Sequence, residues 1–153
     1  MNCTLNMKHK LYLDVCCLNR PSDAQDQERV QIETEAVVVV LASIQRGANV
    51  LIGSRALDWE NNRNSNVERR EKVRSILKWA KAYVEVGDVE ISRADELSQR
   101  GFSYQDALHI ACAESAKADC LLTTDDGMLR RSGRCQDDLR VRVLNPIDWA
   151  KGQ

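Results

Sequence analysis

Short apolar segments alternate along this chain with longer segments of helical periodicity, and this alternation constrains the fold more than any other feature. Strands are expected over residues 10–15, 49–53, 83–86, 118–123 and 141–144. In the segments between them, apolar side chains recur every three or four positions, as in amphipathic helices. Helices are therefore expected over residues 27–46, 54–61, 66–82, 92–100, 103–117 and 125–131. The pattern predicts βαβ units and an α/β fold, a three-layer α/β/α sandwich with a central, mainly parallel sheet.

Length and composition indicate one globular domain over residues 1–153. The net charge of −1 and pI of about 6.1 argue against a dedicated DNA-coating protein, which would usually be basic. The longest apolar run, residues 36–42, is far shorter than the roughly 20 residues that span a bilayer. The polar N-terminus lacks the apolar centre of a signal peptide, so we expect a cytoplasmic protein with no membrane partner. Residues 1–8 are expected to form a disordered leader, and Met7 is an alternative start.

Six cysteines and two histidines show no spacing typical of a zinc site or a disulfide framework, because no Cys-x-x-Cys pair occurs. We interpret the thiols as small buried side chains in a reducing compartment. The segment 16–26 is rich in turn-forming residues and is expected to be a loop. The run 37–41 within the first long helix is apolar on all sides, which indicates either deep burial or pairing with another chain.

Acidic residues stand where predicted strands end. Asp14 follows the apolar part of the first strand, and Asp125 follows the strand of residues 118–123. Ligands of such sheets bind outside the carboxyl ends of the strands. Asp106 lies in the first turn of a helix, and Glu60 lies in the helix after the second strand. Acids from four distant segments are thus expected to converge at one edge.

Converging carboxylates repel each other unless a cation neutralises them, and Mg²⁺ or Mn²⁺ prefers carboxylate and water oxygens. A metal held in this way can polarise a phosphoryl oxygen and activate a water molecule. Each acid also has an ordinary explanation: Asp106 follows the predicted cap Ser103 by three residues, Asp125 suits the cap of the next helix, and Glu60 suits an exposed helix face. Only Asp14 has no obvious capping task. Taken together, the four favour a metal site.

Three stretches of the sequence resemble the PIN-domain family of metal-dependent ribonucleases. They are LYLDVCCLNRP at 11–21, SRALDWENNRN at 54–64 and SYQDALHIACAESAKADCLLTTDD at 103–126. The tail VRVLNPIDW at 141–149 is similar to the last strand of the family, so the resemblance extends over nearly the whole chain. Its most specific part is the helix DALHIA followed by a strand and Thr-x-Asp. The resemblance implies a PIN-like fold, Mg²⁺ or Mn²⁺ as cofactor, and hydrolysis of RNA phosphodiester bonds.

The resemblance also implies roles for particular residues. The metal-holding and catalytic acids would be Asp14, Glu60, Asp106 and Asp125. Asp58 competes with Glu60 for the second position, and Asp126 competes with Asp125 for the fourth, where the spacing from Thr123 favours Asp125. Contacts to substrate would come from Asn19, Arg20, Thr123 and Arg130. An arginine at such a position is also commonly a solvated surface charge.

Many bacterial members of this family are toxins that a partner antitoxin holds inactive, and members commonly form homodimers. The resemblance thus implies RNA as substrate, with an antitoxin or a second copy of the chain as protein partner. The alternative function is a non-catalytic PIN scaffold that binds RNA or a protein. Other phosphotransfer enzymes are disfavoured: Asp14 starts no Asp-x-Asp pair, and no G-x-x-x-x-G-K loop occurs. The sequence does not distinguish tRNA, mRNA or rRNA as substrate.

Overall fold

The computed structural model describes residues 8–153, so the expected leader lies, except for Lys8, outside the described residues. One sheet of five parallel strands runs through this part in the order β3-β2-β1-β4-β5. Its strands are β1 (Lys10–Leu13), β2 (Val50–Ser54), β3 (Ala82–Val84), β4 (Cys120–Leu122) and β5 (Arg142–Leu144). In the register, Leu11 of β1 lies opposite Leu51 of β2 and Cys120 of β4. The predicted parallel α/β sheet is confirmed.

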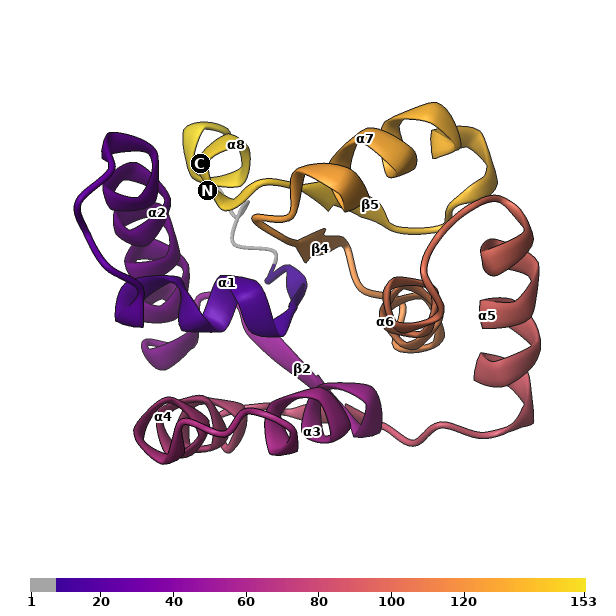
Figure 1. Cartoon of the computed structure of the whole chain (residues 1–153), viewed down its shortest axis with the longest axis horizontal. Helices are drawn as coiled ribbons and strands as arrows, with labels where there is room; N and C mark the ends of the chain where they lie inside the picture. Colours follow the sequence, from indigo (N-terminus) through magenta and orange to yellow (C-terminus); the bar gives the residue numbers. More distant parts are fainter. Residues whose placement is uncertain (1–7) are drawn as a thin grey trace, which may run out of the picture.

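Helices cover both faces of this sheet (Figure 1). They are α1 (Val15–Asn19), α2 (Glu28–Gln45), α3 (Arg55–Asn62), α4 (Val67–Leu77), α5 (Asp88–Gln99), α6 (Tyr104–Ser115), α7 (Asp126–Arg134) and α8 (Pro146–Lys151), with two short 3-10 helices, η1 (Arg20–Ser22) and η2 (Gln136–Asp138). Within residues 8–153, no helix is long and apolar enough to cross a membrane.

Alternating side chains of the central strand β1 face two separate cores, as the two-residue period of a strand requires. Tyr12 belongs to the core with α3, α5, α6 and α7, whereas Leu11 and Leu13 belong to the core with α1, α2, α4 and α8. All three side chains are fully buried. The sheet is therefore the middle layer of an α/β/α sandwich, as predicted.

Two serines fix the starts of the helices that carry candidate acids. Ser54 Oγ accepts a hydrogen bond from the Leu57 amide (3.1 Å) at the start of α3. Ser103 Oγ accepts one from the Asp106 amide (3.1 Å) at the start of α6. These bonds satisfy amide groups that have no partner within the helix. The Ser103 cap was predicted from the sequence.

Two expectations about local structure were wrong. Residues 16–26 are not simply a loop, because α1 begins at Val15 directly after Asp14, whose carboxylate caps it. The fifth helix begins at Asp88 rather than Ser92, and Glu90 Oε1 accepts a hydrogen bond from the Gly87 amide (2.9 Å) across its start. In both cases a capping contact from an acidic side chain outweighs the turn-like or polar composition.

The apolar run on α2 is only partly buried. Val37 and Val40 are fully buried in the core, whereas Val38 and Val39 are 53% and 51% exposed. The predicted helix is confirmed, since α2 runs unbroken over Glu28–Gln45 and ends before Gly47, whose φ is +80°. Half of the valine run thus faces outward.

Candidate active site

Asp14 lies at the carboxyl end of the central strand and is almost fully buried. Its amide donates to the Leu122 carbonyl of β4 (3.2 Å), which places Asp14 beside the end of that strand. Its Oδ1 accepts hydrogen bonds from the Cys17 amide (3.1 Å) and the Cys16 thiol (2.9 Å). The carboxylate therefore has a fixed orientation at the sheet edge.

The segment after β4 supplies a hydroxyl and a second carboxylate to the same edge. Thr123 is fully buried, and its Oγ1 accepts a hydrogen bond from the Asp125 amide (3.1 Å). Asp125 Oδ1 accepts from the Gly127 amide (3.0 Å) and caps α7. Asp125 Oδ2 has no hydrogen bond to the described part of the chain, so one oxygen remains available to a ligand.

Asp106 lies in the first turn of α6, near enough to Asp125 and Glu60 for their charges to act on it. Burial is the largest cause that raises the pKa of Asp106, and the negative charges of Asp125 and Glu60 add to it. Burial likewise raises the pKa of Asp14, while hydrogen bonds from Cys16 and Thr123 act in the opposite direction. Both carboxylates would thus gain from a nearby cation.

Glu60 is positioned by a buried chain of polar side chains that sequence reasoning missed. His109 Nε2 lies 2.7 Å from Glu60 Oε1, and His109 Nδ1 lies 2.7 Å from the Tyr12 hydroxyl. The Tyr12 hydroxyl also lies 2.7 Å from Ser54 Oγ. Two signals could have revealed this chain: Tyr12 stands two residues before Asp14, on the same strand face, and His109 stands one helical turn after Asp106.

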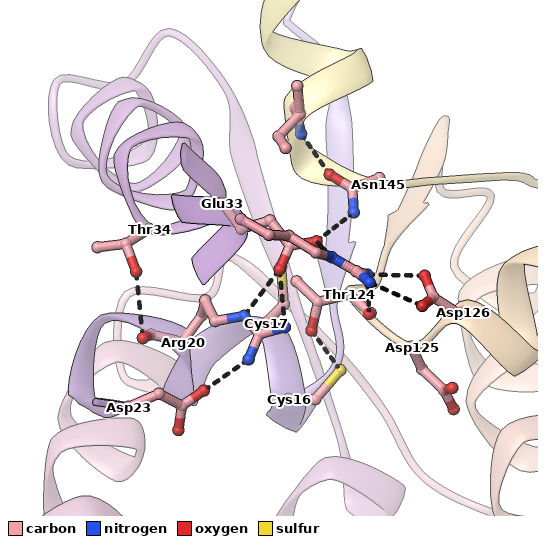
Figure 2. A network of polar contacts seen from close by, with 12 residues as sticks. Cys16, Cys17, Arg20, Asp23, Glu33, Thr34, Thr124, Asp125, Asp126 and Asn145 are labelled. Carbon is pink, nitrogen blue, oxygen red and sulfur yellow. Dashed lines mark hydrogen bonds and ion pairs between the residues drawn. The ribbon is translucent and has the colours of Figure 1, made fainter. Parts of the chain in front are cut away.

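The acid doublet after β4 is divided between two tasks (Figure 2). Asp126 accepts two hydrogen bonds from the Arg29 guanidinium, each 2.7 Å long, and the Asp125 side chain points away from this pair. Asp58 accepts a hydrogen bond from the Tyr83 hydroxyl (2.5 Å), whereas Glu60 contacts His109. Asp58 and Asp126 thus have hydrogen-bond partners outside the set of candidate metal ligands.

The predicted substrate contacts lie in different settings. Thr123 lies beside the candidate acids, since its Oγ1 accepts a hydrogen bond from the Asp125 amide. Arg20 donates to Glu33 Oε1 (2.9 Å) and Asp23 Oδ2 (3.0 Å), so carboxylates of the chain itself hold its guanidinium. Arg130 is exposed on α7. Asn19 ends α1, and its buried Oδ1 has no hydrogen-bond partner within residues 8–153.

The donor chemistry of this group suits a hard divalent cation, which prefers carboxylate oxygens. As the side chains stand, no three acidic, histidine or cysteine residues in the described part come close enough together to hold a metal ion. A cation would therefore have to draw the uncapped Asp106 and Glu60 carboxylates toward Asp14 and Asp125 by side-chain rotation. Glu60 Oε2 has no hydrogen bond to the described residues, which leaves that oxygen free to turn.

Comparisons with known proteins identify the family. The sequence profile described as "PIN domain" matches residues 11–133, which is most of the chain. Among curated protein sequences, none matches the chain significantly.

Solved structures share the fold at low sequence identity. VapBC-1 from nontypeable Haemophilus influenzae is similar with a TM-score of 0.56 and 13% identity, over 90% of this chain and 98% of that chain. VapBC2 from Rickettsia felis, bound to a DNA fragment from its promoter, has a TM-score of 0.54 and 13% identity, over 89% of this chain and 98% of that chain. PAE2754 from Pyrobaculum aerophilum has a TM-score of 0.51 and 14% identity, over 96% of this chain and 100% of that chain. Together with the profile match, these findings show that the chain belongs to the PIN domain family.

Proposed function

We propose that this protein is a Mg²⁺- or Mn²⁺-dependent endoribonuclease. The observation that carries the proposal is the placement of Asp14 and Asp125 after the adjacent strands β1 and β4, with Asp106 near enough for the charges of Asp125 and Glu60 to raise its pKa. Nucleases of the PIN family generally depend on a divalent metal. The raised pKa values of Asp14 and Asp106 support the proposal: burial makes the charged form of both carboxylates costly, the charges of Asp125 and Glu60 add to this cost at Asp106, and a cation would offset it.

The roles of the residues follow from their positions. Asp14, Asp106 and Asp125 would hold the cation through carboxylate oxygens, and Glu60 would hold it or orient the attacking water. A bound divalent cation polarises a phosphoryl oxygen and lowers the pKa of water. His109 keeps the Glu60 carboxylate at the edge through the contact to Oε1. RNA is the proposed substrate, with Arg130 as a candidate phosphate contact because its side chain is exposed.

A thermal melt with and without millimolar Mn²⁺ tests the metal site. Wild type should gain stability on Mn²⁺ addition, because a ligand that binds only the folded state stabilises it. Asp14→Asn should show no gain, and Asp137→Asn, an exposed acid on η2, should respond like wild type. Single-stranded RNA should be cut by wild type and Asp137→Asn but not by Asp14→Asn. Equal melts with and without Mn²⁺ in wild type would instead favour the non-catalytic scaffold.

We further propose a protein partner on the outer face of α2, as in a toxin–antitoxin pair. Two of the similar structures are VapBC complexes. In this chain an apolar groove of about 590 Å³ lies between α1, α2 and α4. Its apolar lining includes Leu18, Val38, Leu41 and Ile76. The exposed Val38 would pack against an apolar segment of an antitoxin or against a second copy of the chain.

Light scattering over a range of concentrations tests the second-copy case. A homodimer should dissociate on Val38→Lys, whereas a constant monomer mass in wild type would exclude the homodimer. Co-expression with the product of a neighbouring gene tests the antitoxin case, with Val38→Lys expected to abolish the complex. Absence of any complex with either wild-type arrangement would contradict the proposed partner. The proposed location of such a protein is the cytoplasm.

A further inference from the structure

A fully buried carboxylate, Glu33 of α2, lies at the centre of the polar network in Figure 2. Its Oε1 accepts from Arg20 Nε (2.9 Å), and its Oε2 accepts from Asn145 Nδ2 (2.7 Å) and Arg29 Nε (3.3 Å). A buried charge is costly unless it is paired and hydrogen-bonded. Glu33 meets this condition with two arginines and an amide, and so it fixes where both guanidinium groups lie.

Arg29 connects this buried carboxylate to the segment that carries a candidate metal ligand. Its guanidinium donates to both carboxylate oxygens of Asp126, at 2.7 Å each, and to the Thr124 carbonyl (3.3 Å). Thr124 and Asp126 are the two neighbours of Asp125. Arg29 of α2 therefore hydrogen-bonds to the backbone of the residue before Asp125 and to the side chain of the residue after it.

Besides the hydrogen bond from the Thr123 amide to the Leu144 carbonyl (2.9 Å) and the buried Met128 side chain, few contacts tie this segment to the rest of the protein. The Asp125 amide bonds to Thr123 and the Asp125 carboxylate to Gly127, and both partners belong to the same segment. Thr124 Oγ1 donates to Cys16 Sγ (3.2 Å), which is a weak sulfur contact. A bidentate arginine–carboxylate pair is stronger and more directional than such a contact. Arg29 thus supplies the strongest side-chain hydrogen bonds between the start of α7 and another element.

We propose that Arg29 is a positioning residue for Asp125: oriented by the buried Glu33, its guanidinium holds Asp126 and the Thr124 carbonyl so that the intervening carboxylate faces the metal site. This inference rests on the proposed metal-dependent function. It also gives each acid of the doublet a role: Asp126 is the ion-pair partner of Arg29, and Asp125 is the candidate metal ligand that Arg29 positions. Arg29 itself touches neither metal nor substrate.

The test compares Arg29→Gln, Asp126→Asn, the double variant and a matched control. The control is Arg100→Gln, which breaks the pair of Arg100 with Asp138. That pair joins α5 to η2, and its side chains are 48% and 42% exposed, against 48% and 54% for Arg29 and Asp126. We call the contacts of Arg29 with Asp126 and the Thr124 carbonyl the clamp. The rate of amide hydrogen exchange in residues 123–130 measures, without any metal, how well the clamp holds this segment. Mn²⁺ titration, followed by the thermal midpoint, reports its effect on the site.

Both Arg29→Gln and Asp126→Asn should speed exchange in residues 123–130 and weaken Mn²⁺ binding by about tenfold or more, the size of effect found when a group that orients a metal ligand is removed. The double variant should be no weaker than Arg29→Gln, because both changes open the same clamp. Arg29→Lys should recover part of the affinity, since an ammonium keeps the charge but not the bidentate geometry. Arg100→Gln should match wild type in both readouts.

Three results would overturn the proposal. Unchanged exchange and Mn²⁺ affinity in Arg29→Gln would show that no clamp exists, while leaving the metal site of wild type intact. Additive losses in the double variant would show that the two residues act separately. The third result combines faster exchange in Arg29→Gln with a wild-type protein that binds no Mn²⁺. It would refute the proposed function and leave Arg29 as a contributor to stability only.

Discussion

Removal of the Tyr12 hydroxyl tests whether the buried chain from Ser54 to Glu60 is real. The hydroxyl contacts Ser54 Oγ and His109 Nδ1, both at 2.7 Å, and Tyr12 is fully buried. Ser54 Oγ keeps its bond from the Leu57 amide in Tyr12→Phe. His109 Nδ1, in contrast, loses its partner inside a residue that is 1% exposed.

The magnitude follows from that single orphaned nitrogen. A buried polar group left without a partner costs about 1–3 kcal/mol, so Tyr12→Phe should lower the free energy of unfolding by about 2 kcal/mol. In a chain of this size each kcal/mol corresponds to roughly 2–4 °C in Tm, which predicts a fall of about 6 °C. The same change frees the His109 ring to turn, so Glu60 should lose orientation and Mn²⁺ affinity should fall as well.

Urea unfolding followed by circular dichroism measures the first effect, and the Mn²⁺-dependent shift in Tm measures the second. Tyr104→Phe is the matched control, because Tyr104 is 49% exposed and an exposed substitution of this kind usually changes stability by less than about 0.5 kcal/mol. A loss in Tyr12→Phe no larger than in Tyr104→Phe would refute the reasoning. It would mean that His109 finds another partner or that the hydroxyl contacts contribute nothing net.

Two further predictions concern buried carboxylates. Burial raises the pKa of Asp14 in the folded chain, so the folded state holds its proton more tightly and the charged form lowers the free energy of unfolding at neutral pH. Metal-free Asp14→Asn should therefore melt above wild type at pH 7, and the difference should shrink as the pH falls through the raised pKa of Asp14; a difference independent of pH in paired melts would contradict this. Glu33→Ala should cost about 3 kcal/mol or more in urea unfolding, because it leaves Arg20 and Asn145 without their buried partner; a loss near zero would show that water replaces the carboxylate.

Local patterns were sufficient to predict the sheet and most helices. The strands around Leu11, Leu51 and Leu121 are short apolar runs bounded by polar residues, and Ser54 and Ser103 are strong N-terminal caps. The segment after Asp14 was mistaken for a loop because its turn-forming residues were weighed by composition. The carboxylate that begins α1 was read only as a candidate metal ligand, and its capping bond to Cys17 was not expected.

The partners of the candidate acids were out of reach of sequence reasoning because they come from distant positions. His109 is 49 residues from Glu60, and Arg29 is 97 residues from Asp126. Neither pair has a spacing that repeats along the chain, so only the folded topology brings them together. The sequence predicted that Asp14 and Asp125 follow strands, which the structure bears out, but the side chains that orient the candidate acids required the structure.

The capping and metal-binding interpretations of the acids, which compete in the sequence, are compatible in the structure. Asp14 and Asp125 each cap a helix through Oδ1, and Asp106 lies in the first turn of α6. A carboxylate at a helix start is stabilised by the amide groups there, typically by 0.3–1 kcal/mol. Such bonds also restrict rotation of the carboxylate, so the same contact that begins the helix aims the second oxygen of Asp125 away from it. Capping thus offsets part of the cost of the Asp14 and Asp125 charges before any cation binds, and this explains how the fold tolerates both carboxylates after adjacent strands.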